Sequence, residues 1–219
     1  MIFQNRREAG QALGERLLKW RDRSDVVVLG IPRGGVVVAA QVAQALRAPL
    51  DVFLTHKIGA PDNPELALGA VASDGTTILD QDIIDDLDVS PEYIERERLA
   101  QLREIERRLA VYRQGRPAVP VADRCAIVCD DGIATGSTAL VALRALRAQQ
   151  PSQVILAIPV SPYSAVDRLA RECDEVAVLA MPEPFIAVGR FYQQFEQVTD
   201  EQVIAALRAA PIARAAGGF

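Results

Sequence analysis

Two adjacent aspartates, Asp130 and Asp131, end an apolar run and precede a short loop that is rich in hydroxyl groups. The run CAIVC at 125–129 has the composition of a buried parallel strand, which would deliver both carboxylates to the C-terminal edge of a sheet. Paired carboxylates are costly there unless they face hydroxyl donors or a cation. The pair therefore predicts a ribose or a magnesium-bound group as its ligand.

The loop after the acids provides the second half of this site. It comprises Ala134, Thr135, Gly136, Ser137 and Thr138, directly before an expected helix over 139–149. Backbone N–H groups and hydroxyls at a helix start bind phosphate, whereas carboxylates repel it. The acids and the loop would thus hold different parts of one sugar phosphate. The alternative is a strand–turn–helix whose polar residues only cap the helix, which leaves the acid pair unexplained.

A second glycine-rich turn follows the first expected strand, at 26–31. Gly34 and Gly35 permit close backbone approach, and Arg33 supplies a guanidinium fork for oxyanions. The helix expected from Gly35 would point its positive end at the same place. Two separate anion-binding turns suit a ligand that carries two separate phosphate groups.

These segments resemble the phosphoribosyl-pyrophosphate (PRPP) signature of type I phosphoribosyltransferases, which is a hydrophobic strand, two acids and a loop ending T-G-x-T. Asp130–Asp131 and the loop at 135–138 match every required position. The turn at 33–35 resembles the family's pyrophosphate loop and is closest to the R-G-G form of xanthine–guanine enzymes. The whole chain is similar to a bacterial branch known simply as predicted phosphoribosyltransferases.

The resemblance implies a role for each matched residue. The catalytic residues would be Asp130, Asp131 and Lys57. The 5′-phosphate would be bound by the loop residues Ala134, Thr135, Gly136, Ser137 and Thr138. The pyrophosphate would be bound by Arg33, Gly34, Gly35 and Lys57. The resemblance also implies a cis peptide at Pro32–Arg33. Mg²⁺ is the expected cofactor, held mainly by PRPP and water, with Asp130 and Asp131 as the candidate protein ligands.

Lys57 is expected at the end of a strand over 50–57, before a glycine- and proline-rich loop and a return strand over 66–72. In the family, such a lysine lies near pyrophosphate and the loop closes over the site, which would exclude water. A solvated lysine at a strand end is an equal alternative. His56 is expected on the opposite face of the strand in a structural role.

The acceptor is the least defined part of the site. Phe185, Phe191, Tyr192 and Phe195 form an aromatic cluster that could stack on a base. Its segment resembles the F-V-V-G stretch of 6-oxopurine enzymes, which makes Phe185 the stacking candidate, although core packing explains the other rings equally well.

Where the 6-oxopurine enzymes carry an aspartate that handles the base proton, this chain has Ala134. Asp62 and Glu65 in the expected mobile loop are the substitutes considered. The identity of the nucleobase-like acceptor therefore stays open.

Composition limits the class of protein. The chain has 219 residues, a net charge of −5 and a pI of about 5.0, which argue against nucleic acid as a partner. No apolar run reaches the ~18 residues of a membrane span, and the first twenty residues read as an amphipathic helix capped by Asn5. Three cysteines, Cys125, Cys129 and Cys173, suit reduced thiols, so a cytoplasmic location is expected.

Apolar strands alternate with amphipathic helices, which predicts an α/β fold with a mainly parallel twisted sheet flanked by helices, the type I phosphoribosyltransferase fold. Strands are expected at 26–31, 50–57, 66–72, 125–130, 154–160 and 176–180, and helices at 6–21, 35–47, 91–114, 139–149, 162–173 and 200–209. Ser90 and Ser161, each before a proline, and Thr199, with Gln202 three residues later, are the expected caps of three of these helices. One domain over 1–219 would carry a helical insertion at about 80–116 and a small C-terminal hood at about 181–200 with the N-terminal residues. The insertion would cover the sheet or meet a partner in a homodimer.

The favoured function is transfer of 5-phosphoribosyl from PRPP to a nitrogen of a nucleobase-like acceptor, which would make the chain a pentosyltransferase. A protein that binds PRPP or a nucleotide to regulate, without turnover, is the rival hypothesis. Such proteins tend to lose the pyrophosphate residues, which this chain retains at positions 33–35 and 57. A hydrolase of phosphoribosyl compounds is the third alternative.

Overall fold

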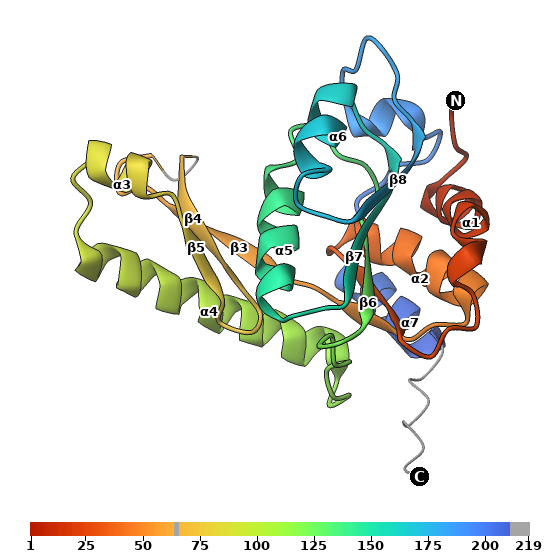
Figure 1. Cartoon of the computed structure of the whole chain (residues 1–219), viewed down its shortest axis with the longest axis horizontal. Helices are drawn as coiled ribbons and strands as arrows, with labels where there is room; N and C mark the ends of the chain where they lie inside the picture. Colours follow the sequence, from red (N-terminus) through yellow and green to blue (C-terminus); the bar gives the residue numbers. More distant parts are fainter. Residues whose placement is uncertain (64–65, 211–219) are drawn as a thin grey trace.

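A computed structural model describes residues 1–63 and 66–210 of the chain. Glu65, one of the two substitute bases considered above, lies outside the described residues. Figure 1 shows a central parallel sheet with helices on both faces and an arm that extends to one side.

The central sheet has five parallel strands in the order β2-β1-β6-β7-β8. Their bounds are β1 Val26–Gly30, β2 Leu50–Val52, β6 Cys125–Cys129, β7 Gln153–Val160 and β8 Glu175–Ala180. Strands β1, β2, β6 and most of β7 are buried on both sides, which explains the continuous apolar runs of β1 and β6. The expectation of an α/β fold with a mainly parallel sheet is confirmed.

Helices cover both faces of this sheet (Figure 1). Alternate residues of the strands enter two core clusters, one with helices α1, α2 and α7 and the other with α5 and α6. Their bounds are α1 Arg6–Arg16, α2 Gly34–Leu46, α5 Ser137–Ala148, α6 Tyr163–Leu169 and α7 Asp200–Ala209, with short 3₁₀ turns at Leu18–Trp20 and Val188–Phe191. No helix in residues 1–63 and 66–210 is long and apolar enough to cross a membrane.

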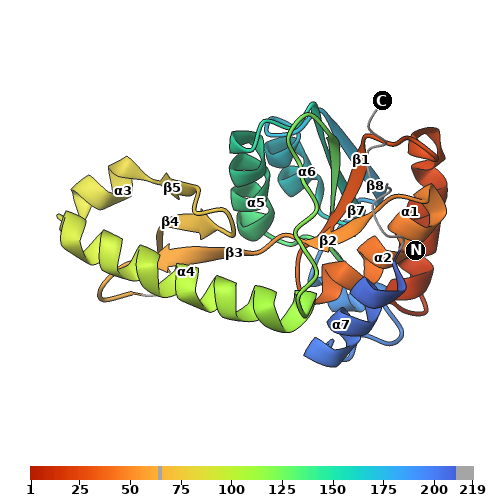
Figure 2. The same cartoon turned by 90° about the horizontal axis from the view of Figure 1, so that it is seen from below.

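The arm is a second, antiparallel sheet backed by two helices (Figure 2). It consists of β3 Thr55–Gly59, β4 Ala67–Ala72, β5 Thr77–Leu79, α3 Gln81–Asp86 and α4 Pro91–Arg113. The sequence predicted the return strand and α4 but neither β5 nor α3. The departure from the central sheet thus begins at β3, well before the helical segment at 80–116.

The expected strand over 50–57 is wrong, because the chain changes sheets in the middle of that range. Phe53 N still donates to Gly30 O at 3.0 Å, but Leu54 O already accepts from Ser73 N at 3.1 Å. The side chains of Phe53 and Leu54 enter opposite core clusters. Residues 52–54 are all apolar, so the hydrophobic pattern does not reveal that the hydrogen-bonding partner changes there.

Helix α4 packs along the base of the arm and against α7. Ile105, Leu109 and Tyr112 of its apolar seam are buried in the main core. Arg113 donates from Nε and Nη2 to the two oxygens of the buried Asp51, at 3.0 and 2.9 Å. The seam thus serves to attach the arm to the central sheet.

The predicted caps are mostly confirmed. Asn5 Oδ1 accepts from two backbone N–H groups of α1, Ser90 caps α4, and Thr199 forms a reciprocal capping box with Gln202. The predicted cap at Ser161 is wrong. Ser161 is fully buried and its backbone N–H donates to Ala180 O, so it still belongs to the sheet edge and α6 begins later.

Candidate functional site

The acid pair lies where the sequence predicted, directly after β6 and beside the end of β1. Asp130 Oδ1 accepts from the N–H of Asp131 at 2.8 Å. Burial raises the pKa of the Asp130 carboxyl well above its usual range, and the neighbouring Asp131 charge adds to the shift. Burial also raises the pKa of Asp131, although Arg6 opposes this effect. Burial thus favours the neutral form of both carboxyls, and the positive charge of Arg6 opposes this effect.

The turn at 33–35 meets the acid pair. A Cβ atom built on Gly34 would lie 1.9 Å from Asp131 Oδ2, and one on Gly35 would lie 2.8 Å from the Cα of Asp130. The peptide between Pro32 and Arg33 is cis, as the resemblance implied. Two glycines in succession are thus needed for α2 to begin against the two carboxylates.

The Arg33 side chain lies beside the start of α7. Its Nη1 lies 3.8 Å from Oδ1 of Asp200, at the start of α7. Tyr112 of the arm donates to the same Asp200 oxygen at 2.9 Å. The backbone of the turn thus lies beside the acid pair, whereas the Arg33 guanidinium lies near Asp200, which also accepts from Tyr112 of the arm.

The hydroxyl loop forms an open turn at the start of α5. Gly136 has φ 76° and precedes Ser137, the first residue of α5. The loop residues Ala134, Thr135, Ser137 and Thr138 are exposed. Thr135 Oγ1 and Ser137 Oγ are 3.5 Å apart, and Gly136 is buried between them. The structure therefore offers hydroxyls and helix N–H groups side by side.

Arg168 of α6 is a neighbour of this loop that the sequence reasoning missed. One of its guanidinium nitrogens donates to the carbonyl oxygen of Thr135. A Cβ on Gly136 would lie 3.2 Å from Arg168 Nη2. The residue lies far from the loop in the sequence, so no local pattern could have identified it.

The hood forms when the N-terminal segment pairs with residues 191–194. Phe3 N donates to Phe191 O and Gln193 N donates to Phe3 O, both at 2.8 Å. Tyr192 OH donates to the carbonyl oxygen of Asp131, and a Cβ on Gly132 would lie 2.5 Å from Val188. The hood therefore rests directly on the residues of the acid pair and the loop after it.

The aromatic cluster belongs to this hood. The rings of Phe185 and Phe191 stack at 5.4 Å, and those of Tyr192 and Phe195 at 4.9 Å. Phe185 is half-buried and packs in the same cluster as Phe3 and Val160. Phe185 therefore keeps a partly open face, while its other neighbours are core contacts.

Arg6 is the second residue that the sequence reasoning missed. Its Nε lies 2.6 Å from Asp131 Oδ2, and its guanidinium carbon lies 3.8 Å from the centre of the Phe195 ring. In the sequence Arg6 is one of several charges in an amphipathic helix, so nothing marks it. Only the fold brings the start of α1 to the end of β6.

Lys57 is not brought to the acid pair by the central sheet. It lies in the middle of β3, opposite Ala70 of β4, and not at a strand end as predicted. Its side chain is exposed and borders a cavity of about 560 Å³ between β3 and α4. The neighbouring His56 has its Nδ1 2.9 Å from Gln101 Oε1 of α4, in agreement with a structural role. Asp62, the substitute base considered, is exposed in the β3–β4 connection.

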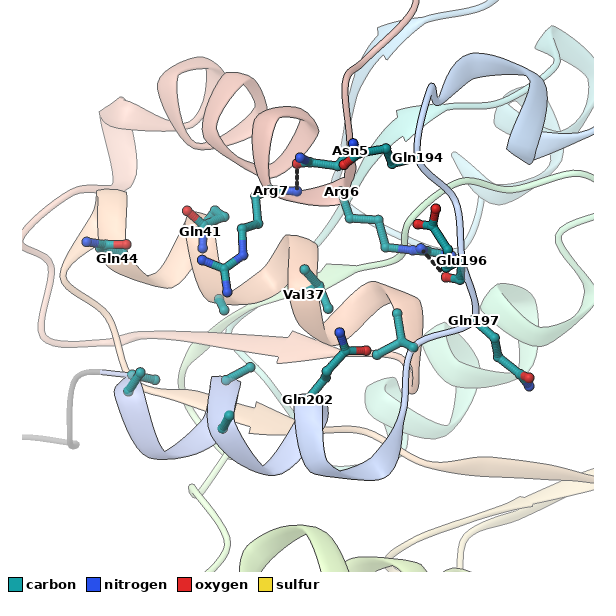
Figure 3. Close-up of a pocket in the computed structure, with 16 residues that line it drawn as sticks. Asn5, Arg6, Arg7, Val37, Gln41, Gln44, Gln194, Glu196, Gln197 and Gln202 are labelled. Carbon is teal, nitrogen blue, oxygen red and sulfur yellow. Dashed lines mark hydrogen bonds between the residues drawn. The ribbon is translucent and has the colours of Figure 1, made fainter.

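A separate groove of about 570 Å³ runs between α1, α2 and α7 (Figure 3). Glutamine side chains and alanines line most of it, together with the two successive arginines Arg6 and Arg7. The two arginines diverge, since Arg7 enters the groove and Arg6 points toward the segment that carries Glu196. The acid pair does not border this groove, and Arg6 is the residue common to both regions.

The chain matches the phosphoribosyl transferase domain family over residues 5–182. It is 43% identical over 206 residues to proteins of two Mycobacterium tuberculosis strains that carry the name "Putative phosphoribosyl transferase". That similarity covers 94% of this chain and 46% of each relative, so the chain spans about half the length of these curated relatives.

Solved structures show the same fold. The protein TT1426 of Thermus thermophilus is 42% identical, with a TM-score of 0.84 over 94% of this chain and 98% of that chain. AQ2163 of Aquifex aeolicus, at 14% identity and a TM-score of 0.52 over 84% and 76% of the two chains, shares the fold alone. The matched segment contains both turns and the acid pair, and the chain belongs to the phosphoribosyl transferase domain family.

Proposed function

We propose that the chain transfers the 5-phosphoribosyl group of PRPP to a nitrogen of a nucleobase-like acceptor and releases pyrophosphate. The observation that carries this proposal is the contact between the turn at 33–35 and the acid pair, where Gly34 leaves room for nothing but hydrogen beside Asp131. A pyrophosphate site and a ribose site must be this close, because the pyrophosphate leaves from the ribose itself.

In the proposed reaction, the acceptor nitrogen forms a bond to C1 of the ribose while the bond from C1 to pyrophosphate oxygen breaks. The electron pair of the broken bond leaves with pyrophosphate, and the acceptor nitrogen loses its proton to solvent. Asp130 and Asp131 hold the ribose hydroxyls and favour the positive charge that grows on the ring. The protein mainly positions the reactants.

Each turn has its own part in this scheme. The hydroxyl loop, Ala134, Thr135, Gly136, Ser137 and Thr138, binds the 5′-phosphate with the help of the α5 N–H groups. The backbone of Arg33, Gly34 and Gly35 binds the leaving pyrophosphate. Lys57 joins them only when the arm brings β3 toward the site, as the family's closing loop does.

The donor groups present fit Mg²⁺ as a cofactor that arrives with its substrate. Among the described residues, no cluster of three or more His, Cys, Asp or Glu could hold an ion. Asp130 and Asp131 offer the hard oxygen ligands that Mg²⁺ prefers, and PRPP and water would supply its remaining ligands. When bound, the ion neutralises charge on the leaving pyrophosphate.

Phe185 is the proposed stacking surface for the acceptor. Its ring is half-buried in the hood, which rests on the acid pair through Tyr192. A flat heterocycle between this ring and the ribose site would bring one of its nitrogens to C1.

The test is pyrophosphate release from PRPP and Mg²⁺ across a panel of purine and pyrimidine bases, with a base-free blank. Asp131→Asn should lose at least about a hundredfold in rate, because it removes one charge next to the developing cation. Asp167→Asn is the matched control, since Asp167 is an exposed aspartate of α6.

Each outcome of this panel assigns a function. Release that depends on one base establishes a transferase and names its acceptor. Release in the blank indicates a hydrolase of phosphoribosyl compounds. PRPP binding with no release for any base supports the regulatory protein instead and contradicts the proposal.

A further inference from the structure

Arg6 stands where the hood meets the acid pair. It is the first residue of α1 and follows closely after Phe3, which pairs with the hood. The side chains of Arg6 and Arg7 leave the helix in different directions (Figure 3). The two neighbouring arginines therefore have different surroundings, so a substitution of Arg7 can serve as the control for a substitution of Arg6.

Three contacts hold the Arg6 guanidinium. Nε lies 2.6 Å from Asp131 Oδ2, Nη1 donates to the carbonyl oxygen of Glu196 at 2.9 Å, and the plane lies over the Phe195 ring. The side chains of Arg6 and Asp131 are only 11% and 16% exposed. Such a group has little freedom, so it can hold its partner carboxylate in one orientation.

The contact engages one oxygen of Asp131. Arg6 donates to Oδ2, and the same oxygen lies against Gly34, so Arg6 leaves Oδ1 to other donors. A carboxylate fixed on one oxygen presents the second in a defined direction, as recognition of a ribose hydroxyl requires.

We infer that Arg6 is a positioning residue for PRPP, which orients the Asp131 carboxylate toward the ribose and joins that carboxylate to the hood through Phe195 and Glu196. The inference rests on the proposed function, because it names Asp131 as the ribose ligand. It extends the site to the N-terminal helix, outside both family motifs.

The opposite role for Arg6 makes the opposite prediction. An arginine that merely blocks Asp131 until PRPP displaces it would weaken PRPP binding, so its removal would tighten the complex. An arginine that orients Asp131 strengthens binding, so its removal weakens the complex. The direction of one measured change therefore separates the two roles.

The experiment is calorimetric titration of the full chain with PRPP and Mg²⁺, which needs no acceptor. Arg6→Ala should weaken PRPP binding by about tenfold or more, since a buried charge-assisted contact is lost. Arg6→Lys keeps the positive charge but lacks the planar guanidinium that donates to Asp131 and lies over Phe195. Its affinity for PRPP should therefore lie between those of the wild type and Arg6→Ala. Arg7→Ala is the control and should bind PRPP as the wild type does.

A double-mutant cycle with Asp131→Asn tests whether Arg6 acts through Asp131. In that background, Arg6→Ala should cause little further loss of PRPP affinity, whereas a general effect on the fold would reduce affinity equally in both backgrounds. Thermal melting of each variant identifies loss of structure, and Arg6→Gln replaces Arg6→Ala if the alanine variant does not melt cooperatively.

The outcomes separate this inference from the proposed function. Wild-type protein that does not bind PRPP overturns both. Wild-type protein that binds PRPP, with Arg6→Ala binding equally well or more tightly, overturns only the role of Arg6. Equal losses in the two Asp131 backgrounds also overturn it.

Discussion

Gly34 and Asp131 are packed so closely that a single methyl group on Gly34 would stand 1.9 Å from the Asp131 Oδ2 atom. The two residues are far apart in the sequence and follow neighbouring parallel strands, β1 and β6. In this pair of strands Val26 lies opposite Cys125 at one end, and Gly30 lies opposite Cys129 at the other. This register brings the glycine turn and the acids to the same sheet edge. The candidate site therefore depends on the β1–β6 pairing.

Gly34→Ala should abolish measurable PRPP binding. The nearest obstacles to a methyl group are the carboxylate of Asp131 and the Arg6 guanidinium, both of which are held by their mutual ion pair. Either the turn or the carboxylate must move, and both belong to the proposed site. Calorimetric titration with PRPP, accompanied by a thermal melt, measures the effect. An alanine variant that binds PRPP like the wild type would show that this contact is dispensable.

Ser137→Ala should weaken PRPP binding by about tenfold or more, because a hydrogen bond to a charged group contributes about 1.5–3 kcal/mol. Ser137 is exposed at the start of α5, and its hydroxyl lies 3.5 Å from that of Thr135, so we expect the substitution to leave the core intact. Ser164→Ala, an equally exposed serine in α6, is the control. The same PRPP dissociation constant in both variants would contradict a phosphate role for the loop.

Arg168→Ala should weaken PRPP binding, because Arg168 holds the carbonyl of Thr135 and places a positive charge beside the loop. We expect a change of about two- to fivefold, less than for a direct buried contact, because the side chain is exposed. Arg171→Ala, an exposed arginine nearby that pairs with Asp167, is the control. Affinity for inorganic phosphate should fall in parallel, and an unchanged affinity for both ligands would exclude this role.

Arg113→Ala should destabilise the chain by about 3–5 kcal/mol, the typical cost of leaving one member of a buried ion pair without its partner. Asp51 is only 4% exposed, and its carboxylate also accepts from the backbone N–H of Val119. The measurement is the unfolding free energy in urea of Arg113→Ala, compared with that of Arg171→Ala, which breaks an exposed ion pair. Similar unfolding free energies for the two variants would mean that the arm is attached by its apolar seam alone.

Tyr112 should make stability depend on alkaline pH. Burial and the hydrogen bond to Asp200 raise the pKa of Tyr112 to about 12, above its ordinary 10.0. The neutral phenol is the form that the fold favours, so its stabilisation is complete below pH 10 and disappears as the pH rises through about 12. The unfolding free energy of the wild type should fall more steeply between about pH 10 and 12 than that of Tyr112→Phe. Parallel curves would contradict this assignment.

The sequence alone identified the chemical groups of the candidate site because they lie next to one another in the chain. Asp130, Asp131 and the loop at 134–138 form one uninterrupted motif, and the turn at 33–35 forms another. Motifs of this kind are local, since a strand, a turn and a helix start are specified by a few neighbouring residues. The parallel sheet followed from the alternation of apolar and amphipathic segments.

The positions of Arg6, Arg168 and Lys57 were decided only by the tertiary structure. Arg6 reaches Asp131 because α1 packs on α2, and Arg168 reaches Thr135 because α6 follows the strand next to β6. Lys57 follows β3 out into the arm because hydrogen bonding passes from β1 to β4 between Phe53 and Leu54. Long-range pairing of this kind leaves no local pattern in the chain, because the same apolar residues can form a strand whichever neighbouring strand they pair with.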